Sequence, residues 1–376
     1  MRADRLVLSR GAIAAMAAGF LLMGMVVASY GPLLEHLSRR FTVGLPVAGA
    51  TISVYFAGSL PGVLVAMRAF ERARARLIVV AAMLISSAGL VGVALAFTWP
   101  LFLAAVCVVG FGFGVLVLGL NQLVAYSEGR RRAALLNALN GCYSAGAVAG
   151  PILVAALAAD HFSALYLGAA AVWLALIPGA WRIGGSLPVG TGLSRWPGAL
   201  VATFVVAFVL YVGVENGIGG WMTSHLESTG LRSRVAATVT SGFWLALVTG
   251  RLLMTLVPST VSEGRIVLLG ALVGTVALAV ASIGPAAPVA YVIAGLAIAP
   301  IFPTGIVWLA KLRPGDSRAT AWLYPAASVG GSAGPGVIGL VIAHAGIGWT
   351  PAVLAAVALG MLATFLIVSR SGGSDQ

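Results

Sequence analysis

The sequence predicts an all-α membrane protein, with twelve transmembrane helices arranged as two pseudo-symmetric six-helix bundles and both termini in the cytoplasm. Three observations support this fold class: the composition, the number of long apolar stretches, and a motif that recurs once in each half. Of the 376 residues, 60% are hydrophobic and only 9% are charged. A soluble domain carries roughly 25% charged residues, so most of this surface must face lipid.

Twelve stretches are long enough to cross a bilayer, since a helix needs about 20 apolar residues to span the hydrocarbon core. The first stretch is longer than the core of a signal peptide, so we expect it to be retained. Glycine (49 residues) and proline (17 residues) recur inside the stretches, as in membrane helices that pack closely and bend. The predicted helices cover residues 11–34, 45–67, 77–97, 100–126, 134–158, 164–181, 199–223, 235–257, 265–284, 288–309, 319–344 and 350–368.

The distribution of basic residues indicates the orientation. A net charge of +12 would suggest a nucleic-acid partner in a soluble protein. With the N-terminus inside, however, 18 of the 22 Lys and Arg residues fall in inner segments, as the positive-inside rule requires. The outer segments hold only Arg39, Arg40, Arg232 and Arg234. We therefore expect a multi-pass protein of the cell inner (cytoplasmic) membrane that binds no nucleic acid.

A motif in predicted helix five recurs in predicted helix eleven. The segments 144–151 and 328–335 share the pattern Ser-x-Gly-x-x-Ala-Gly-Pro at an offset of 184 residues. A weaker match joins residues 50–53 to residues 237–240 at an offset of 187, in helices two and eight. Because both offsets agree with the helix numbers, duplication of a six-helix unit is a better explanation than chance similarity.

The longest inner connection is rich in glycine and proline and follows the sixth helix. It divides the chain into an N-terminal six-helix bundle (1–182), a cytoplasmic linker (183–198) and a C-terminal six-helix bundle (199–376).

Two parallel six-helix halves, related by an axis along the membrane normal, form the architecture of the major facilitator superfamily. The chain resembles transporters of this superfamily over nearly its full length. Within the superfamily, Tyr211–Trp221 and Asn137–Pro151 resemble the fucose permease-like group of sugar:proton symporters. The resemblance implies a monomeric, non-enzymatic transporter without a cofactor, in which helices one, four, seven and ten line a cavity for a small-molecule substrate and protons.

The chain departs from the family pattern in two places. The loop between helices two and three carries Glu71 and Arg72 where the superfamily has Asp-Arg, and Met67 where it has glycine. The resemblance assigns Glu71 and Arg72 to a latch between conformations. The sugar symporters of the group also carry acids in helices one and four, and this chain has none there, so the usual proton site is missing.

Glu215 is the acidic residue that sits within a predicted span. The other nine of the ten acids map to loops or helix ends. An ionisable group at membrane depth is costly and usually faces a cavity or a partner, and such a carboxyl group can take up and release a proton. We therefore assign proton coupling to Glu215. The alternative is that Glu215 lies near the outer end of the helix and only bonds backbone or a neighbouring helix.

Two predicted helices near this site contain helix-breaking residues. Glycines at 213, 217, 219 and 220 weaken helix seven, and Pro300 and Pro303 interrupt helix ten. Interrupted helices point to a transporter site, although ordinary kinking to fit neighbours explains them equally well. The asparagines of helices four and five either contribute to an inner gate or satisfy helix ends. The candidate substrate-binding residues are Tyr30, Asn121, Asn137, Asn140, Tyr143, Tyr211, Glu215, Asn216, Trp244, Phe302, Trp322 and Tyr324.

The spans contain no cluster of metal ligands, no nucleophile–base set and no Walker motif, so we expect neither a metal site, nor an enzyme, nor an ATP-driven pump. The sequence favours a secondary active transporter of a small polar or amphipathic solute, sugar-like, that works by alternating access. A proton-antiporting exporter of drugs or metabolites is the first alternative. A membrane sensor or scaffold that keeps the fold without transport is the second.

Overall fold

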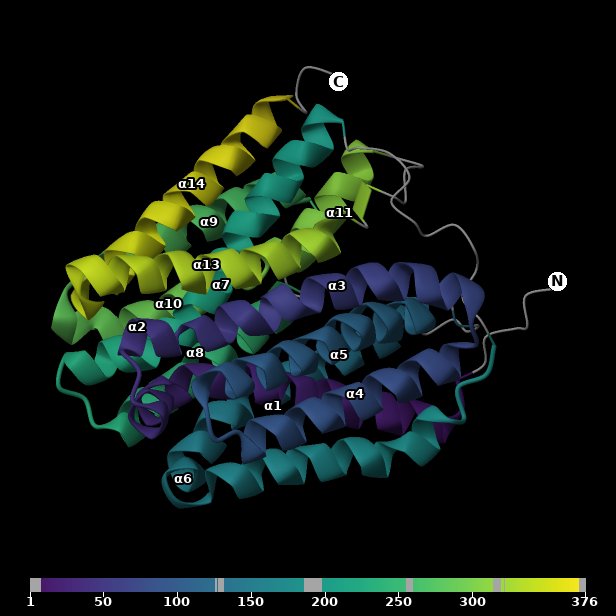
Figure 1. Cartoon of the computed structure of the whole chain (residues 1–376). Helices are drawn as coiled ribbons and strands as arrows, with labels where there is room; N and C mark the ends of the chain where they lie inside the picture. The colour runs from purple at the N-terminus through teal and green to yellow at the C-terminus, as the bar shows by residue number, and fades with distance from the viewer. Residues whose placement is uncertain are drawn as a thin grey trace. The chain divides into compact units, whose positions relative to one another are not determined.

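The structure, a computed structural model, describes residues 8–125, 127, 132–185, 198–254, 260–313, 319–320 and 322–371. Nearly all of these residues are helical, apart from short turns and one isolated β-bridge between Leu8 and Ile183. The first helices are α1 (Arg10–Phe41), α2 (Leu45–Ala48), α3 (Ala50–Arg72), α4 (Ala75–Leu95), α5 (Trp99–Ala125) and α6 (Arg132–Ala180) (Figure 1).

The remaining helices cover the second half of the chain. They are α7 (Ala199–Ser228), α8 (Ser233–Leu253), α9 (Glu263–Val280), α10 (Ala287–Ile298), α11 (Ile301–Leu312), α13 (Leu323–Ala345) and α14 (Thr350–Ser371), with the 3-10 turns η2 (Gly284–Ala286) and η3 (Ile347–Trp349).

The described residues contain twelve helices long and apolar enough to cross a membrane, which confirms the predicted number of spans. Predicted helices five and six are the two spans Ala138–Leu157 and His161–Ala180, which share the label α6 and are separated by non-helical backbone at His161 (φ −132°, ψ 31°). Predicted helix ten consists of α10 and α11, which meet at Ala299 and Pro300. Both meeting residues keep helical φ/ψ angles, so the span continues from α10 into α11 across the proline.

Large apolar side chains cover the outer faces of these helices. Leu95, Leu269, Val289 and Leu340 are each more than 60% exposed. Water would penalise so much exposed hydrocarbon, whereas the interior of a bilayer solvates it. The helices also satisfy their own backbone hydrogen bonds, as a lipid environment demands.

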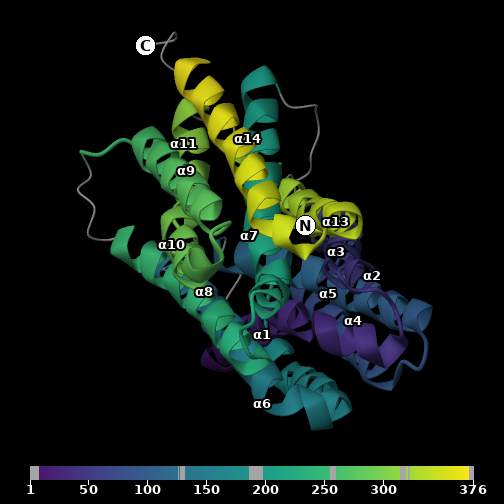
Figure 2. The ribbon, with the colours of Figure 1, turned by 90° about the vertical axis from the view of Figure 1, so that its left-hand side faces the viewer.

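The chain forms two compact units. The first comprises residues 1–29, 39–42 and 54–192, and the second comprises residues 30–38, 43–53 and 193–376. The predicted division into residues 1–182, 183–198 and 199–376 stays a prediction, and residues 186–197 of the predicted linker lie outside the described residues. In the first unit α4 packs against α5 and α6 (Figure 1). In the second unit α7 packs against α13 and α14, and α10 against α8 and α9 (Figure 2).

The repeated glycines make the same kind of contact in each unit. In the first unit, a Cβ atom on Gly146 of α6 would overlap the carbonyl oxygen of Leu21 in α1. In the second unit, a Cβ atom on Gly330 of α13 would overlap the carbonyl oxygen of Val209 in α7. Helix five thus lies directly on the backbone of helix one, and helix eleven on that of helix seven. Small residues that let helix backbones touch are the usual means of association in membranes.

Candidate functional site

Glu215 lies in α7 and forms an ion pair with Arg251 of α8. A guanidinium nitrogen of Arg251 is 3.5 Å from Oε1 of Glu215. The Glu215 side chain is 14% exposed and that of Arg251 is 32% exposed. Both residues belong to membrane-spanning helices, Ala199–Ser228 and Ser233–Leu253. The pair therefore places one negative and one positive charge at the same place inside the second unit.

Arg251 is a site residue that the sequence patterns did not single out. It counts among the inner basic residues, yet it falls inside the predicted helix 235–257 and in the last turn of α8. A lone arginine inside a span requires a partner, and Glu215 is the carboxylate that meets it. The need of an arginine inside a span for a partner could therefore have indicated the Glu215–Arg251 pair from the sequence.

A cluster of aromatic side chains from α7 and α11 (Phe208, Tyr211 and Phe302) lies beside the ion pair. Tyr211 precedes Glu215 by one helical turn and so shares its face of α7, and its side chain is fully buried. Its ring lies 6.1 Å from that of Phe302 in α11, measured between centroids. Phe208 lies 5.2 Å from Phe302. The structure thus brings together the predicted site residues Tyr211, Glu215 and Phe302.

The glycines around Glu215 do not interrupt helix seven, so the expected break in that helix was wrong. The helix α7 is continuous over 30 residues, from Ala199 to Ser228. Its glycines instead admit neighbouring side chains: a Cβ atom on Gly219 would lie 2.7 Å from the ring of Trp244. Trp244 is accordingly buried against α7.

Other predicted residues of the second unit are partly or fully buried. Asn216 donates from Nδ2 to the carbonyl of Val212, at 3.1 Å, and so satisfies its own helix. Tyr30 is buried. Trp322 precedes the first turn of α13 and Tyr324 lies within it, and both side chains are partly exposed.

In the first unit, two predicted asparagines bond to each other across α5 and α6. Nδ2 of Asn140 donates to Oδ1 of Asn121 at 3.2 Å and to the carbonyl of Leu136 at 2.9 Å. Asn121 donates to the carbonyl of Val117 at 2.6 Å. These contacts match the interpretation that the asparagines satisfy and join helices.

The other predicted residues of the first unit are placed less fully. Tyr143 lies 6.5 Å from Phe113, measured between ring centroids. The side chain of Asn137 lies outside the described part of the chain, as does that of Glu71. Arg72 ends α3 with an exposed side chain. In the second unit, Lys311 of α11 pairs with Glu263 of α9, a contact that the sequence did not predict.

The joining role predicts the effect of removing the Asn140 amide. We expect Asn140→Ala to lower the free energy of unfolding by about 0.6 kcal/mol, because interhelical hydrogen bonds in membranes average that value. The solute KM should stay within about twofold of wild type, a difference of under half a kcal/mol. Thermal unfolding in detergent and flux in vesicles measure the two quantities. A KM raised far beyond twofold with unchanged stability would assign Asn140 to the substrate site instead.

The twelve apolar spans make this a multi-pass membrane protein, and its fold and sequence are similar to those of major facilitator transporters. Residues 16–189 match the sequence model of the Major Facilitator Superfamily. Sodium-dependent glucose transporter 1A of Mus musculus is 23% identical, over 88% of this chain and 89% of the mouse protein. The predicted resemblance to this superfamily is thereby confirmed.

Two solved structures share the fold at low sequence identity. The D-xylose-proton symporter superposes with a TM-score of 0.77 at 14% identity, over 94% of this chain and 96% of that one. A mutant of the nucleoside transporter NupG superposes with a TM-score of 0.75 at 13% identity, over 96% of this chain and 100% of that one.

Proposed function

We propose that this chain is a secondary active transporter that moves a small, polar, sugar-like solute and couples its movement to protons through Glu215. The observation that carries the proposal is the Glu215–Arg251 ion pair inside two membrane spans. We place the protein in the cell inner membrane as a monomer with both termini in the cytoplasm. The two six-helix bundles would alternate about the site, with Glu71 and Arg72 as the latch.

The ion pair supplies a simple coupling step. When Glu215 is ionised, its carboxylate holds the Arg251 guanidinium. Protonation of Glu215 removes the negative charge and leaves Arg251, an obligate cation with five N–H donors, to bind a new acceptor. A hydroxyl or carbonyl oxygen of the solute is such an acceptor. Proton uptake and solute binding would thus favour the same state, which is what symport requires.

The aromatic cluster beside the ion pair fits a sugar-like solute. Phe302, which is partly exposed, packs against the buried Tyr211 one helical turn from Glu215. Sugars offer apolar C–H faces together with hydroxyl groups, so they can meet ring and ion pair at once. Support for this class also comes from the mouse relative and the D-xylose-proton symporter, which are named for sugars.

Sodium is the second candidate coupling ion, because the mouse relative is named as sodium-dependent. We expect the coupling ion to be the proton, because the described spans contain a titratable carboxylate, Glu215, with a charged partner, Arg251.

Flux into reconstituted vesicles tests the function and the coupling ion together. Labelled D-glucose and D-xylose should accumulate against a concentration gradient when a pH gradient is imposed, to a limit of about tenfold per pH unit for one proton per solute. A sodium gradient of the same size at constant pH should give equilibration only. Accumulation driven by sodium alone would overturn proton coupling.

The same vesicles separate the alternative functions. Efflux of hydrophobic cations driven by a pH gradient, without sugar flux, would identify an exporter. No flux of any solute, with no change in protein conformation on adding ligand, would favour the sensor or scaffold.

A further inference from the structure

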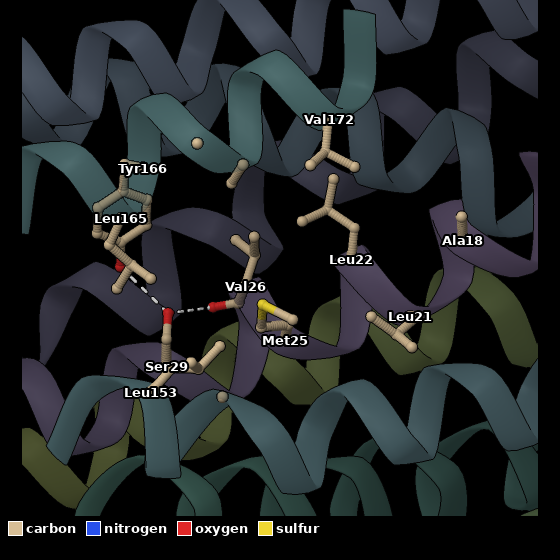
Figure 3. Close-up of a pocket in the computed structure, with 13 residues that line it drawn as sticks. Ala18, Leu21, Leu22, Met25, Val26, Ser29, Leu153, Leu165, Tyr166 and Val172 are labelled. Atoms are coloured by element: carbon tan, nitrogen blue, oxygen red, sulfur yellow. Dashed lines mark hydrogen bonds between the residues drawn. The ribbon is translucent and has the colours of Figure 1, made fainter. Parts of the chain in front are cut away.

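An apolar cavity of about 310 Å³ lies in the first unit, far along the chain from the Glu215–Arg251 pair. One wall is α1, and the other is formed by both membrane-spanning segments of α6. Figure 3 shows Leu22, Met25 and Val172 pointing into the space between these helices. The surface of the cavity is almost entirely hydrocarbon.

The polar atoms of the cavity are already satisfied. At one end, Ser29 donates to the carbonyl of Val26 at 2.7 Å, so the Tyr166 hydroxyl, 3.1 Å away, donates to Ser29 (Figure 3). Both residues are buried. The cavity therefore offers no free donor for a sugar and excludes charged groups, while an apolar chain can fill it without leaving a polar group unpaired.

The cavity is continuous with the lipid-facing surface. Leu21 and Val172 line it, yet they are 38% and 42% exposed. Gly168 also lines it, and a Cβ atom there would meet no atom within 4 Å. The side toward these residues is therefore open, and in a membrane the medium beyond it is lipid hydrocarbon.

The cavity lies along the middle of the first span, at the depth of the hydrocarbon core. Its lining residues on α1 run from Ala18 to Ser29, a rise of about 16 Å at 1.5 Å per residue. Since the hydrocarbon core is about 30 Å thick, an acyl chain in the cavity stays within that core. We propose that this cavity is a binding site for one acyl chain of a bilayer phospholipid, held between α1 and the two spans of α6.

Photo-crosslinking tests the site directly. The probe is a phosphatidylethanolamine with a diazirine near the methyl end of one acyl chain, incorporated into vesicles that hold the full-length protein. After irradiation, mass spectrometry should place adducts on the lining residues of α1 and α6. Gly168→Leu should lower the yield of these adducts about tenfold, because its side chain takes the place of chain methylenes.

Gly141→Leu is the matched control. Gly141 also lies in α6 and is exposed, and a Cβ atom there would likewise meet no atom within 4 Å. It does not line the cavity, so the adduct yield should equal that of wild type. A second filling variant, Ala18→Phe, should act like Gly168→Leu from the opposite wall.

Three results would overturn the proposal. Adducts that Gly168→Leu and Ala18→Phe leave unchanged would place the chain elsewhere. Displacement of the probe by excess D-glucose or D-xylose would make the cavity part of the solute path. Adducts formed only by a diazirine sterol would assign it to a different lipid. Flux through the transporter is measured separately, so a failure of the proposed function leaves this result standing.

Discussion

Glu215→Gln should leave the protein folded and abolish the coupling of solute flux to a pH gradient. Glutamine keeps the size of the side chain and removes the group that binds a proton. Wild-type vesicles should accumulate solute about tenfold per pH unit for one proton per solute, whereas the variant should only equilibrate it. Counterflow of labelled against unlabelled solute should persist, because the amide leaves Arg251 available to the solute as a protonated carboxyl would.

Glu263→Gln is the matched control for this variant. It removes the same charge from a residue whose partner, Lys311, is 63% exposed. Exposed pairs contribute little, so accumulation should be retained. Normal accumulation by Glu215→Gln would show that another group carries the proton, and loss of counterflow together with accumulation would assign Glu215 to solute binding itself.

Gly146→Leu should strongly destabilise the first unit. Even a Cβ atom at this position would overlap the Leu21 carbonyl, so α6 and α1 would have to separate along the contact. We expect a loss of about 3 kcal/mol, the upper end of the cost of overpacking, against a total stability of roughly 5–15 kcal/mol. The yield of monodisperse protein in detergent and its thermal midpoint measure the effect.

Gly330→Leu should act equally in the second unit, because its Cβ atom would overlap the Val209 carbonyl. Gly141→Leu, on the same helix as Gly146 but in open surroundings, should unfold like wild type. Equal stability of Gly146→Leu and Gly141→Leu would contradict the close contact between α1 and α6.

The spans and the repeat were predictable from the sequence because both depend on composition and spacing. Long apolar runs determine where helices cross, and the glycines shared by segments 144–151 and 328–335 proved to be contact points in both units. Each of these signals lies within a single stretch of sequence, so no knowledge of neighbouring helices was needed.

Partners between helices were harder to predict. Glu215 stands out because an acid in a span is unusual, but Arg251 fits an inner segment equally well, since a basic residue near a helix end also obeys the positive-inside rule. Only the packing of α8 on α7 decides between the two interpretations. The glycines of α7 misled for a similar reason: alone they weaken a helix, but here they make room for side chains such as Trp244.

Ala299 and Pro300 divide the tenth span into two arms, α10 and α11. The first arm, α10, packs beside Gly250, where a Cβ atom would lie 2.7 Å from the Leu296 carbonyl. The second arm, α11, carries Phe302 against Tyr211. Since Gly250 adjoins Arg251 in the chain, α10 lies near the cation, whereas α11 carries the aromatic ring of Phe302. A tilt of either arm would change the distance between the Arg251 guanidinium and the Phe302 ring, and with it the width of the space between them.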